Sequence, residues 1–573
     1  MRPRATRFTG LSSIPALPGH VYRALRAQRA MSSAGPESPG AAQQPRYIYA
    51  SPSLPNIRLK YRQRELSHEF SAMSETASHL SRPSLRLRLE NFRLFRDSGW
   101  FRLAPLTCLV GRNSSGKSSV LSALLLLKQS IEQETMGEAL TPLTLAGPYC
   151  DLGNYTAVVH RHSESAELSI SVAVLLADLT RHFREKRPPL VRLAIPRSRS
   201  MVRFGYFGRW METALPETGS VEARLTFSAA EPFGPSLSRI AMSVSNVGAA
   251  RFVRTVSGER RQHWRVYTDT LPPRSLALRL SPRAFFPLID VRSGSYNRSA
   301  RGTRRRLRTF AGACQLLFRF LTDALWQSDV IGPFRTPPER RYAFGGFSAA
   351  RKGPSGQQAV DLLITEALLR SSPTRPLHAA LSFWIRHLRL AQSLDVKDIA
   401  KRLNLFEVDI AGAGPGTRAN LVDVGFGVSQ ILPVLVQGLL MQPGGIYLVQ
   451  QPEIHLHPDA QAGLADFFIY LAAHGIITVV ETHSEYLLLR LRRRLAEGAK
   501  PLVTGVSGER GDISPLTPDD VAVLFTGATK RAATVRQLEI GESFQFDNLP
   551  SGFMSQALED RVALLRAVSR RNG

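Results

Sequence analysis

The pattern of apolar and polar residues predicts a buried parallel sheet built from distant parts of the chain. Three short apolar runs with few polar side chains occupy residues 106–110, 446–449 and 476–480. Runs of this length and composition are typical of strands that are covered on both faces, and polar residues follow each of them. Such sheets bind ligands where the carboxyl ends of their strands meet, so we expect a functional site at these polar ends.

Other stretches show the periods of helices and of half-buried strands. Residues 85–90 alternate apolar and polar side chains, which predicts a strand with one buried face. Strand-like runs at residues 168–176 and 221–228, joined by Arg-rich connections, predict a globular insertion, and the lack of a sustained heptad repeat there argues against a coiled-coil arm. We also expect short strands near residues 406–411. Apolar residues at helical spacing predict helices after residue 117 and over residues 315–325, 359–370, 377–403 and about 460–474.

A phosphate-binding loop joins the first buried strand to the helix after it. Residues 111–118, Gly-Arg-Asn-Ser-Ser-Gly-Lys-Ser, match the G-x-x-x-x-G-K-[ST] pattern at every fixed position. The glycines let consecutive backbone N–H groups point at phosphate oxygens, and the helix N-terminus adds the positive end of its dipole. Lys117 would reach the β- and γ-phosphates of ATP, and the Ser118 hydroxyl would bind Mg2+. The predicted cofactor-binding residues here are Gly111, Arg112, Asn113, Ser114, Ser115, Gly116, Lys117, Ser118 and Ser119.

Composition sets limits on this picture. With 573 residues, 43% hydrophobic and 21% charged, the chain can bury more than one core. Three separated cysteines fit a reducing compartment, and the apolar stretches are too short or too interrupted to span a bilayer, so we expect a soluble, cytoplasmic protein without a membrane partner. The formal charge of +28 favours DNA or another polyanion as a partner, but 65 Arg against only 9 Lys also fits a GC-rich genome.

Three polar segments follow the later apolar runs or precede a helix. Gly427, Ser429 and Gln430 form a second phosphate-sized loop before an apolar helix, a weak signal by itself. Residues 450–459 read Gln-Gln-Pro-Glu-Ile-His-Leu-His-Pro-Asp, and residues 481–484 read Glu-Thr-His-Ser.

The segments GRNSSGKSS, GPFRTPPER, DVGFGVSQ and QPEIHLHP, in this order, resemble the ABC-type ATPase heads of the OLD-like, RecF and SMC class. The resemblance implies an α/β P-loop NTPase fold of the ABC-ATPase head type, with a mainly parallel central sheet, an antiparallel β subdomain and a helical insertion. It implies ATP and Mg2+ as cofactors, with Ser118 and Gln450 at the metal. By the same resemblance Gly427, Ser429 and Gln430 bind the nucleotide of a second subunit, in a homodimer that sandwiches two ATP molecules.

The resemblance also assigns roles around the later strands and divides the chain. Asp459 would lie in the loop after the second strand, and His483 would be the switch histidine that senses the γ-phosphate. The predicted domains are a basic low-complexity extension over residues 1–83, an ATPase domain over 84–500 with an insertion at about 151–400, and a small C-terminal domain over 501–573. The extension resembles a transit peptide, a disordered arm or an over-extended gene start, and we favour the last two.

One departure from the family pattern concerns catalysis. Where the class has an acidic Mg2+ ligand and a catalytic glutamate, this chain has Gln450 and Gln451, and a neutral amide neither holds a cation nor accepts a proton well. Glu453 is the nearest carboxylate and could replace the missing base if the chain stays extended through Pro452. The predicted catalytic residues are Glu453, Gln451 and His483.

Several alternatives stay open from the sequence. The leading hypothesis is a slowly hydrolysing ATPase in a DNA-related or anti-phage defence process, working with a separate effector protein; a non-catalytic ATP-binding scaffold and, less favoured, an ABC transporter subunit are the others. Arg335, Arg340 and Arg341 would either face phosphate or lie in a solvated turn. His455 and His457 invite a metal interpretation, but packing at a turn explains them more simply.

Overall fold

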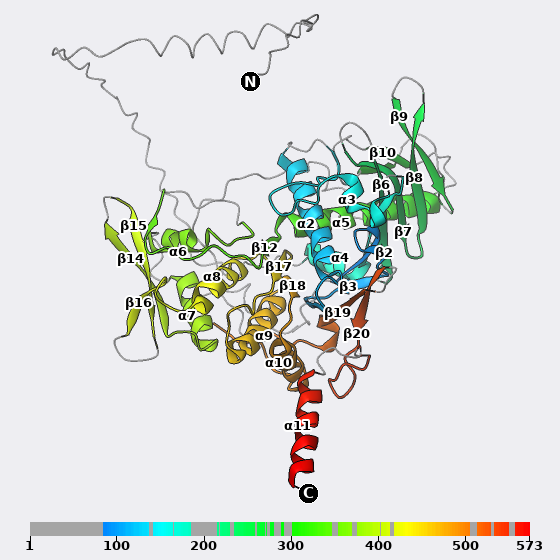
Figure 1. Cartoon of the computed structure of the whole chain (residues 1–573). Coiled ribbons are helices and arrows are strands. Elements are labelled where there is room, and N and C mark those ends of the chain that lie inside the picture. Colours follow the sequence, from blue (N-terminus) through cyan, green and yellow to red (C-terminus); the bar gives the residue numbers. More distant parts are fainter. Residues whose placement is uncertain are drawn as a thin grey trace, which may run out of the picture. The chain divides into compact units, whose positions relative to one another are not determined.

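The computed structural model describes the chain from Ser84 to Asn572 with gaps, and the predicted extension over residues 1–83 lies outside the described residues. Figure 1 shows the elements with their labels. The gaps are residues 137–140, 164, 185–214, 217, 230–233, 258–260, 270, 272–275, 280–287, 292–300, 346–352, 369–374, 401–402, 413–416, 505–512, 529–531, 549 and 551–555.

A six-stranded sheet forms the centre of the fold, and all its neighbouring strands are parallel except the last pair. The three apolar runs are confirmed as strands β4, β17 and β18 of this sheet. Their polar ends therefore meet at one edge, as the sequence pattern predicted. The strand order is β12 (Asp329–Ile331), β17 (Ile446–Gln450), β18 (Ile477–Glu481), β4 (Leu106–Gly111), β19 (Val521–Ala528) and β20 (Ala533–Leu538).

Helices cover both faces of the central sheet. Side chains alternate along each buried strand, so both faces are apolar and both need a cover. Leu109 and Val479 pack in one core with α2 (Lys117–Met136) and α5 (Arg301–Trp326). Val110 and Val480 pack in the other core, to which five further helices contribute. These are α6 (Ala359–Leu368), α7 (Pro376–His387), α8 (Phe426–Leu439), α9 (Pro458–Ala473) and α10 (Glu485–Ala496).

An eight-stranded antiparallel sheet packs against the α2 core and starts with the strand predicted from the period-two pattern. Its order is β2-β1-β5-β6-β7-β8-β9, with β3 paired to β1. The strands from the predicted insertion thus extend the sheet that β1 begins. Their bounds are β1 (Leu85–Phe92), β2 (Phe95–Asp97), β3 (Phe101–Leu103), β5 (Leu168–Leu175), β6 (Ser220–Ser228), β7 (Ser236–Val244), β8 (Gly248–Ser257) and β9 (Arg261–Thr268).

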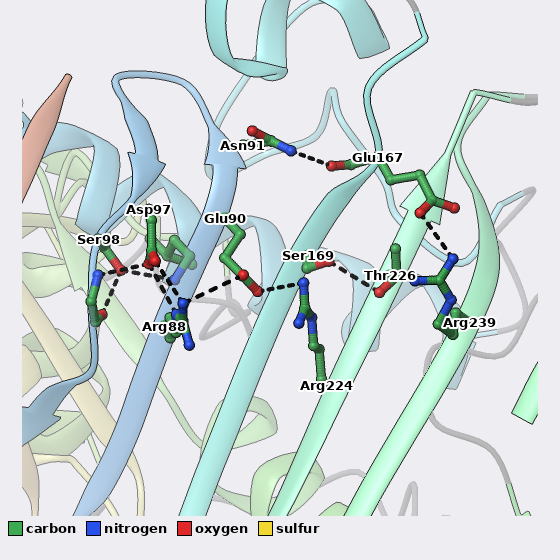
Figure 2. A network of polar contacts seen from close by, with 12 residues as sticks. Arg88, Glu90, Asn91, Asp97, Ser98, Glu167, Ser169, Arg224, Thr226 and Arg239 are labelled. Carbon is green, nitrogen blue, oxygen red and sulfur yellow. Dashed lines mark hydrogen bonds and ion pairs between the residues drawn. The ribbon is translucent and has the colours of Figure 1, made fainter. Parts of the chain in front are cut away.

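On one face of this sheet, charged side chains of β1, β2 and β6 pair with each other (Figure 2). Arg88 binds Asp97 through two hydrogen bonds of 2.9 and 2.6 Å, and Nη2 of Arg224 lies 2.9 Å from Oε2 of Glu90. These pairs compensate one another, and exposed pairs of this kind contribute little to stability. This face is therefore polar without being strongly basic.

A smaller sheet follows α7 and corrects one prediction. We predicted a continuous helix over residues 377–403, but α7 ends at His387 and β14 (Ser393–Ala400) follows. Arg389 has a positive φ of 56°, which stops the helix, and residues 393–397 alternate polar and apolar side chains as a strand requires. The sheet also contains β13 (Tyr342–Ala343), β15 (Leu405–Ala411) and β16 (Arg418–Asn420), and β15 confirms the predicted strand near residues 406–411.

The described residues thus form an α/β P-loop NTPase fold with a mainly parallel central sheet, an antiparallel β layer and a helical insertion, as predicted. The domain boundaries stay a prediction, but β19 and β20, from the segment predicted as a separate C-terminal domain, are strands of the central sheet. The remaining elements are α3 (Tyr155–Val158), η1 (His160–His162), α4 (Leu176–Arg184), β10 (Leu276–Arg279), β11 (Leu288–Val291), η4 (Pro518–Asp520) and α11 (Gln556–Asn572).

Candidate nucleotide-binding site

The loop between β4 and α2 has the backbone conformation that a phosphate-binding loop needs. Gly111 and Gly116 adopt φ values of 140° and 113°, and Ser114 also has a positive φ of 59°. A Cβ at Gly111 would lie 2.5 Å from the backbone oxygen of Thr526, so only glycine fits there. The sequence thus places glycine at the two positions where the turn and the close packing exclude a side chain.

Lys117, the first residue of α2, is held inside this loop. Its ammonium donates hydrogen bonds to the carbonyl oxygens of Gly111 (2.9 Å) and Arg112 (2.8 Å), and only 4% of the residue is exposed. Burial lowers the pKa of Lys117, and the negative charge of Glu481 acts in the opposite direction. The two carbonyl oxygens hold the ammonium against the loop, and its contact with the β- and γ-phosphates stays a prediction.

Strand β19 braces the loop from the side opposite β18, a contact that we did not predict. Thr526 lies in register with Gly111, and its buried hydroxyl is 2.6 Å from that of Ser115 and 3.3 Å from the carbonyl oxygen of Val110. No local sequence signal marks Thr526, because its partners lie about 400 residues earlier in the chain. Thr526 therefore helps to fix the loop through tertiary structure alone.

The predicted metal-side residues lie at the end of β17. Gln450 is the last residue of the strand, and Gln451 has a positive φ of 44° just before Pro452. The condition set for Glu453, a chain that stays extended through Pro452, is therefore not met, because a turn begins at once. The guanidinium of Arg335 holds this turn with 3.0 Å hydrogen bonds to the carbonyl oxygens of Gln450 and Gln451.

Arg335 was predicted either to face phosphate or to lie in a solvated turn, and it does neither. Only 6% of it is exposed, and it also donates to the carbonyl oxygen of Gln430 at 3.3 Å. Burial lowers its pKa, while Tyr447 and Glu453 act in the opposite direction. Arg335 thus ties the start of α8 to the end of β17.

Glu453 reaches the site through the turn rather than along an extended strand. Its Oε1 accepts a 2.6 Å hydrogen bond from the backbone N–H of His483, while its buried Oε2 has no hydrogen-bond partner among the described residues. Burial raises the pKa of Glu453, and the His483 N–H acts against this rise. The structure therefore brings Glu453 and His483, two of the predicted catalytic residues, into direct contact.

The loop after β18 joins these residues to the phosphate loop. The backbone N–H of Thr482 donates to the carbonyl oxygen of Leu109 on β4 at 3.1 Å. The side chain of His483 is exposed, and both burial and the charge of Lys117 lower its pKa, which places it near the ammonium. Glu481, the last residue of β18, is another carboxylate at this edge.

The second predicted phosphate loop lies at the start of α8, beside the turn after β17. Gly427 approaches the backbone of His455, since a Cβ there would lie 3.0 Å from its carbonyl oxygen, and Ser429 and Gln430 are mostly buried in the first turn. Among the described residues, no hydrogen bond or ion pair joins Gly427, Ser429 or Gln430 to residues 111–119. Strands β17 and β4 are two strand spacings apart, roughly 10 Å.

The other candidate residues are engaged elsewhere. Arg340 forms two exposed hydrogen bonds, of 2.9 and 2.6 Å, with Asp423, and Arg341 pairs with Glu407. His457 precedes α9 and accepts a hydrogen bond from the N–H of Asp459, as expected for packing at a turn. No cluster of three or more metal-ligating side chains occurs in the part of the chain that the structure describes.

A buried ion cluster joins helices α7, α9 and α10 next to the site. Asp466 on α9 is 3% exposed and accepts hydrogen bonds from Arg490 (2.8 Å) and Arg494 (2.6 Å) on α10 and from His387 (2.9 Å) on α7. Its pKa is about 2: burial alone would raise the value, but these hydrogen bonds and charges lower it by more. The cluster fixes the helix that follows His483.

These residues fit a nucleoside triphosphate with a divalent cation. The glycine-containing loop ends at the start of a helix, whose N-terminus favours an anion, and Lys117 supplies a positive charge there. For the cation, the exposed Ser118 hydroxyl and the Gln450 amide are neutral oxygen donors, and Glu453 and Glu481 are the nearby carboxylates.

Comparisons with known families support an AAA-type ATPase. A family model described as "AAA ATPase domain" matches residues 85–172, which include the phosphate loop. A second model, described as "AAA domain, putative AbiEii toxin, Type IV TA system", matches residues 374–490, which include Ser429, Gln450 and His483. No curated protein matches the chain.

Solved structures with some likeness are SMC heads. The SMC head bound to the C-winged helix domain of ScpA shows 11% identity and a TM-score of 0.36, covering 79% of this chain and 98% of that one. An SMC head with an extended coiled coil bound to the C-terminal domain of ScpA, from Pyrococcus furiosus, shows 12% and 0.35, covering 85% and 100%. The Thermotoga maritima SMC head domain shows 11% and 0.32, covering 80% and 100%. At these scores the likeness carries no argument, and the fold assignment rests on the strand order and the phosphate loop.

The described residues contain no helix that is both long and apolar enough to span a membrane.

Proposed function

We propose that this chain is an ATP-binding, slowly hydrolysing ATPase of the ABC class that works as an ATP-gated homodimer. The observation that carries the proposal is the common edge of the central sheet, where Lys117 lies with Glu453, Glu481 and His483 at the ends of neighbouring strands. The edge combines phosphate-binding donors with carboxylates that can act on water.

Glu453 is the proposed proton acceptor. Hydrolysis breaks the bond between the γ-phosphorus and its bridging oxygen and forms one to a water oxygen, so the water must lose a proton. The buried Oε2 of Glu453 is free of hydrogen bonds within the described residues, and a pKa raised by burial makes this carboxylate a stronger base than an ordinary glutamate. Bound Mg2+ at Ser118 and Gln450 would neutralise charge on the phosphate oxygens.

The neutral end of β17 supports slow turnover. Neither Gln450 nor Gln451 brings a negative charge, and losing a general base typically costs about 10² to 10⁴ in rate. Oε1 of Glu453 is also engaged by the His483 N–H. The same observations favour a second candidate function, an ATP-binding scaffold without useful turnover.

A homodimer is proposed because the start of α8 does not complete the site of its own chain. Gly427, Ser429 and Gln430 make no hydrogen bond or ion pair to the phosphate loop within the described residues. Phe426, at the exposed start of α8, is 67% exposed next to the ring of His455. A second copy facing this surface would bring Ser429 to its own nucleotide.

The proposed biological process is a DNA-related or anti-phage defence process. The description of the family that matches residues 374–490 names a putative AbiEii toxin, and the formal charge is +28. The family description supports a defence process and the charge supports contact with DNA; by the sequence resemblance we place this role in the cytoplasm, with a separate effector protein. DNA binding would weaken steeply with salt, as a fluorescence titration at rising NaCl concentration would reveal.

The central test is nucleotide binding and phosphate release by the purified full chain. Lys117→Ala should abolish binding of a fluorescent ATP analogue, whereas Lys397→Ala, an exposed lysine paired with Asp409 on the small sheet, should leave binding unchanged. A Lys117→Ala protein that binds as tightly as the parent would overturn the proposal. Phosphate release at saturating ATP then separates the slow ATPase from the scaffold.

A further inference from the structure

The charge that Gln450 and Gln451 lack has a counterpart on the neighbouring strand. Glu481 ends β18, which lies between β17 and β4, and it is in register with Gln450 on one side and Leu109 on the other. In-register residues of parallel strands point to the same face of the sheet. Leu109 packs in the α2 core, so Glu481 and Gln450 lie on the face from which α2 and Lys117 arise.

Burial and charge place the Glu481 carboxylate close to the phosphate loop. Glu481 is only 6% exposed. Burial raises its pKa, the ammonium of Lys117 lowers it and the charge of Glu453 raises it further. The effect is reciprocal, because Glu481 raises the pKa of Lys117 against the effect of burial. The carboxylate is therefore near the cation that would meet the β- and γ-phosphates.

Gln450 and Glu453, two of the other oxygen donors, are less well placed. A Cβ at Gly332, which follows β12, would lie 3.8 Å from Oε1 of Gln450, so this amide oxygen lies near the outer neighbour of β17. Glu453 is already bound by the His483 N–H. Glu481 is one strand spacing, about 4.8 Å, from the strand that leads into the phosphate loop.

We propose that Glu481 supplies the negative side chain of the Mg2+ half of the site, in place of an acidic residue at the end of β17. The inference deepens the proposed function and rests on it. A carboxylate favours Mg2+ either as a direct ligand or through a coordinated water, and a neutral amide does so far less. The alternative is that Glu481 serves only as the counter-charge of Lys117.

The test follows binding of a fluorescent ATP analogue as MgCl2 is raised from zero in buffer with EDTA. Glu481→Gln should need at least about tenfold more Mg2+ for half-maximal binding, while binding in EDTA should stay equal or become tighter because a negative charge near the phosphates is gone. The double variant Glu481→Gln with Gln450→Glu should restore only part of the Mg2+ response, since position 450 is in register on the same face but one strand further from β4.

The matched control is Glu497→Gln, which removes an exposed acid just after α10 and should match the parent. Thermal unfolding of each variant without nucleotide checks that the fold is kept. An unchanged Mg2+ response in Glu481→Gln would overturn the inference, and so would an equal loss of binding with and without Mg2+, which is the result expected of a mere Lys117 partner. A parent that binds no nucleotide would instead overturn the proposed function itself.

Discussion

Replacing Asp466 by asparagine tests the buried ion cluster that supports the site. The substitution keeps the size of the side chain and removes the charge that faces Arg490 and Arg494, both about three-quarters buried. A carboxyl whose pKa falls from 3.8 to about 2 on folding contributes about 2.5 kcal/mol at neutral pH. Leaving two half-satisfied guanidinium groups adds to the loss, so we expect the free energy of unfolding to fall by about 2 to 4 kcal/mol at pH 7.

The pH dependence gives the sign of the effect. Because folding depresses the pKa of Asp466, its contribution is complete above about pH 5 and is lost progressively as the pH falls toward 2. The difference between parent and variant should therefore shrink between pH 5 and pH 3. Urea unfolding followed by circular dichroism at pH 7, 5, 4 and 3 measures it.

Glu497→Gln serves as the control, because Glu497 also pairs with Arg494 but is exposed, and we expect no measurable change. A loss for Asp466→Asn that is the same at pH 3 as at pH 7 would show that packing, and not charge, stabilises this cluster. A loss below about 0.5 kcal/mol at pH 7 would refute the reasoning altogether.

Three further predictions concern the site. Gln451→Glu should raise phosphate release by about 10² if the missing base limits the step, while Glu453→Gln should remove most of the parent rate; a fast parent that is indifferent to both changes would place the base elsewhere. Ser429→Arg should abolish ATP-dependent dimerisation in sedimentation experiments, and an oligomer that ignores both ATP and this change would contradict the sandwich. Thr526→Val should weaken ATP binding several-fold and lower the free energy of unfolding by about 1 to 3 kcal/mol, since the buried Ser115 hydroxyl loses its partner; equal affinity in a binding titration would show that β19 does not brace the loop.

The sequence predicted the features that local patterns determine. The three buried strands, the phosphate loop and α9 each lie within a short segment whose apolar spacing or glycine positions decide its conformation. The helix predicted over residues 377–403 is wrong beyond His387. The chain leaves the helix at Arg389, which has a positive φ, and the residues after it form strand β14.

Long-range contacts explain what could not be predicted. Arg335 lies in a Pro-rich segment that reads as a loop in the sequence. Its burial depends on carbonyl groups of Gln430, Gln450 and Gln451, which lie about 95 to 116 residues later. Likewise the strand that contains Thr526 gave no sign that it would pair with β4, so residues 501–573 looked separate from the central sheet. In both cases the residue type is uninformative until the partner is known.

The strand order also explains how a site with neutral residues at the end of β17 can still hold a carboxylate near the phosphate loop. Because β18 separates β17 from β4, an acid at position 481 is nearer to the phosphate loop than one at position 450 or 451. The positive φ of Gln451 then turns the chain so that Glu453 binds the loop that follows Glu481. Two buried carboxylates already face one another at this edge, and each resists ionisation because it is buried. A third acid at position 451 would be repelled by both, which raises its pKa and makes the expected gain of Gln451→Glu larger at higher pH.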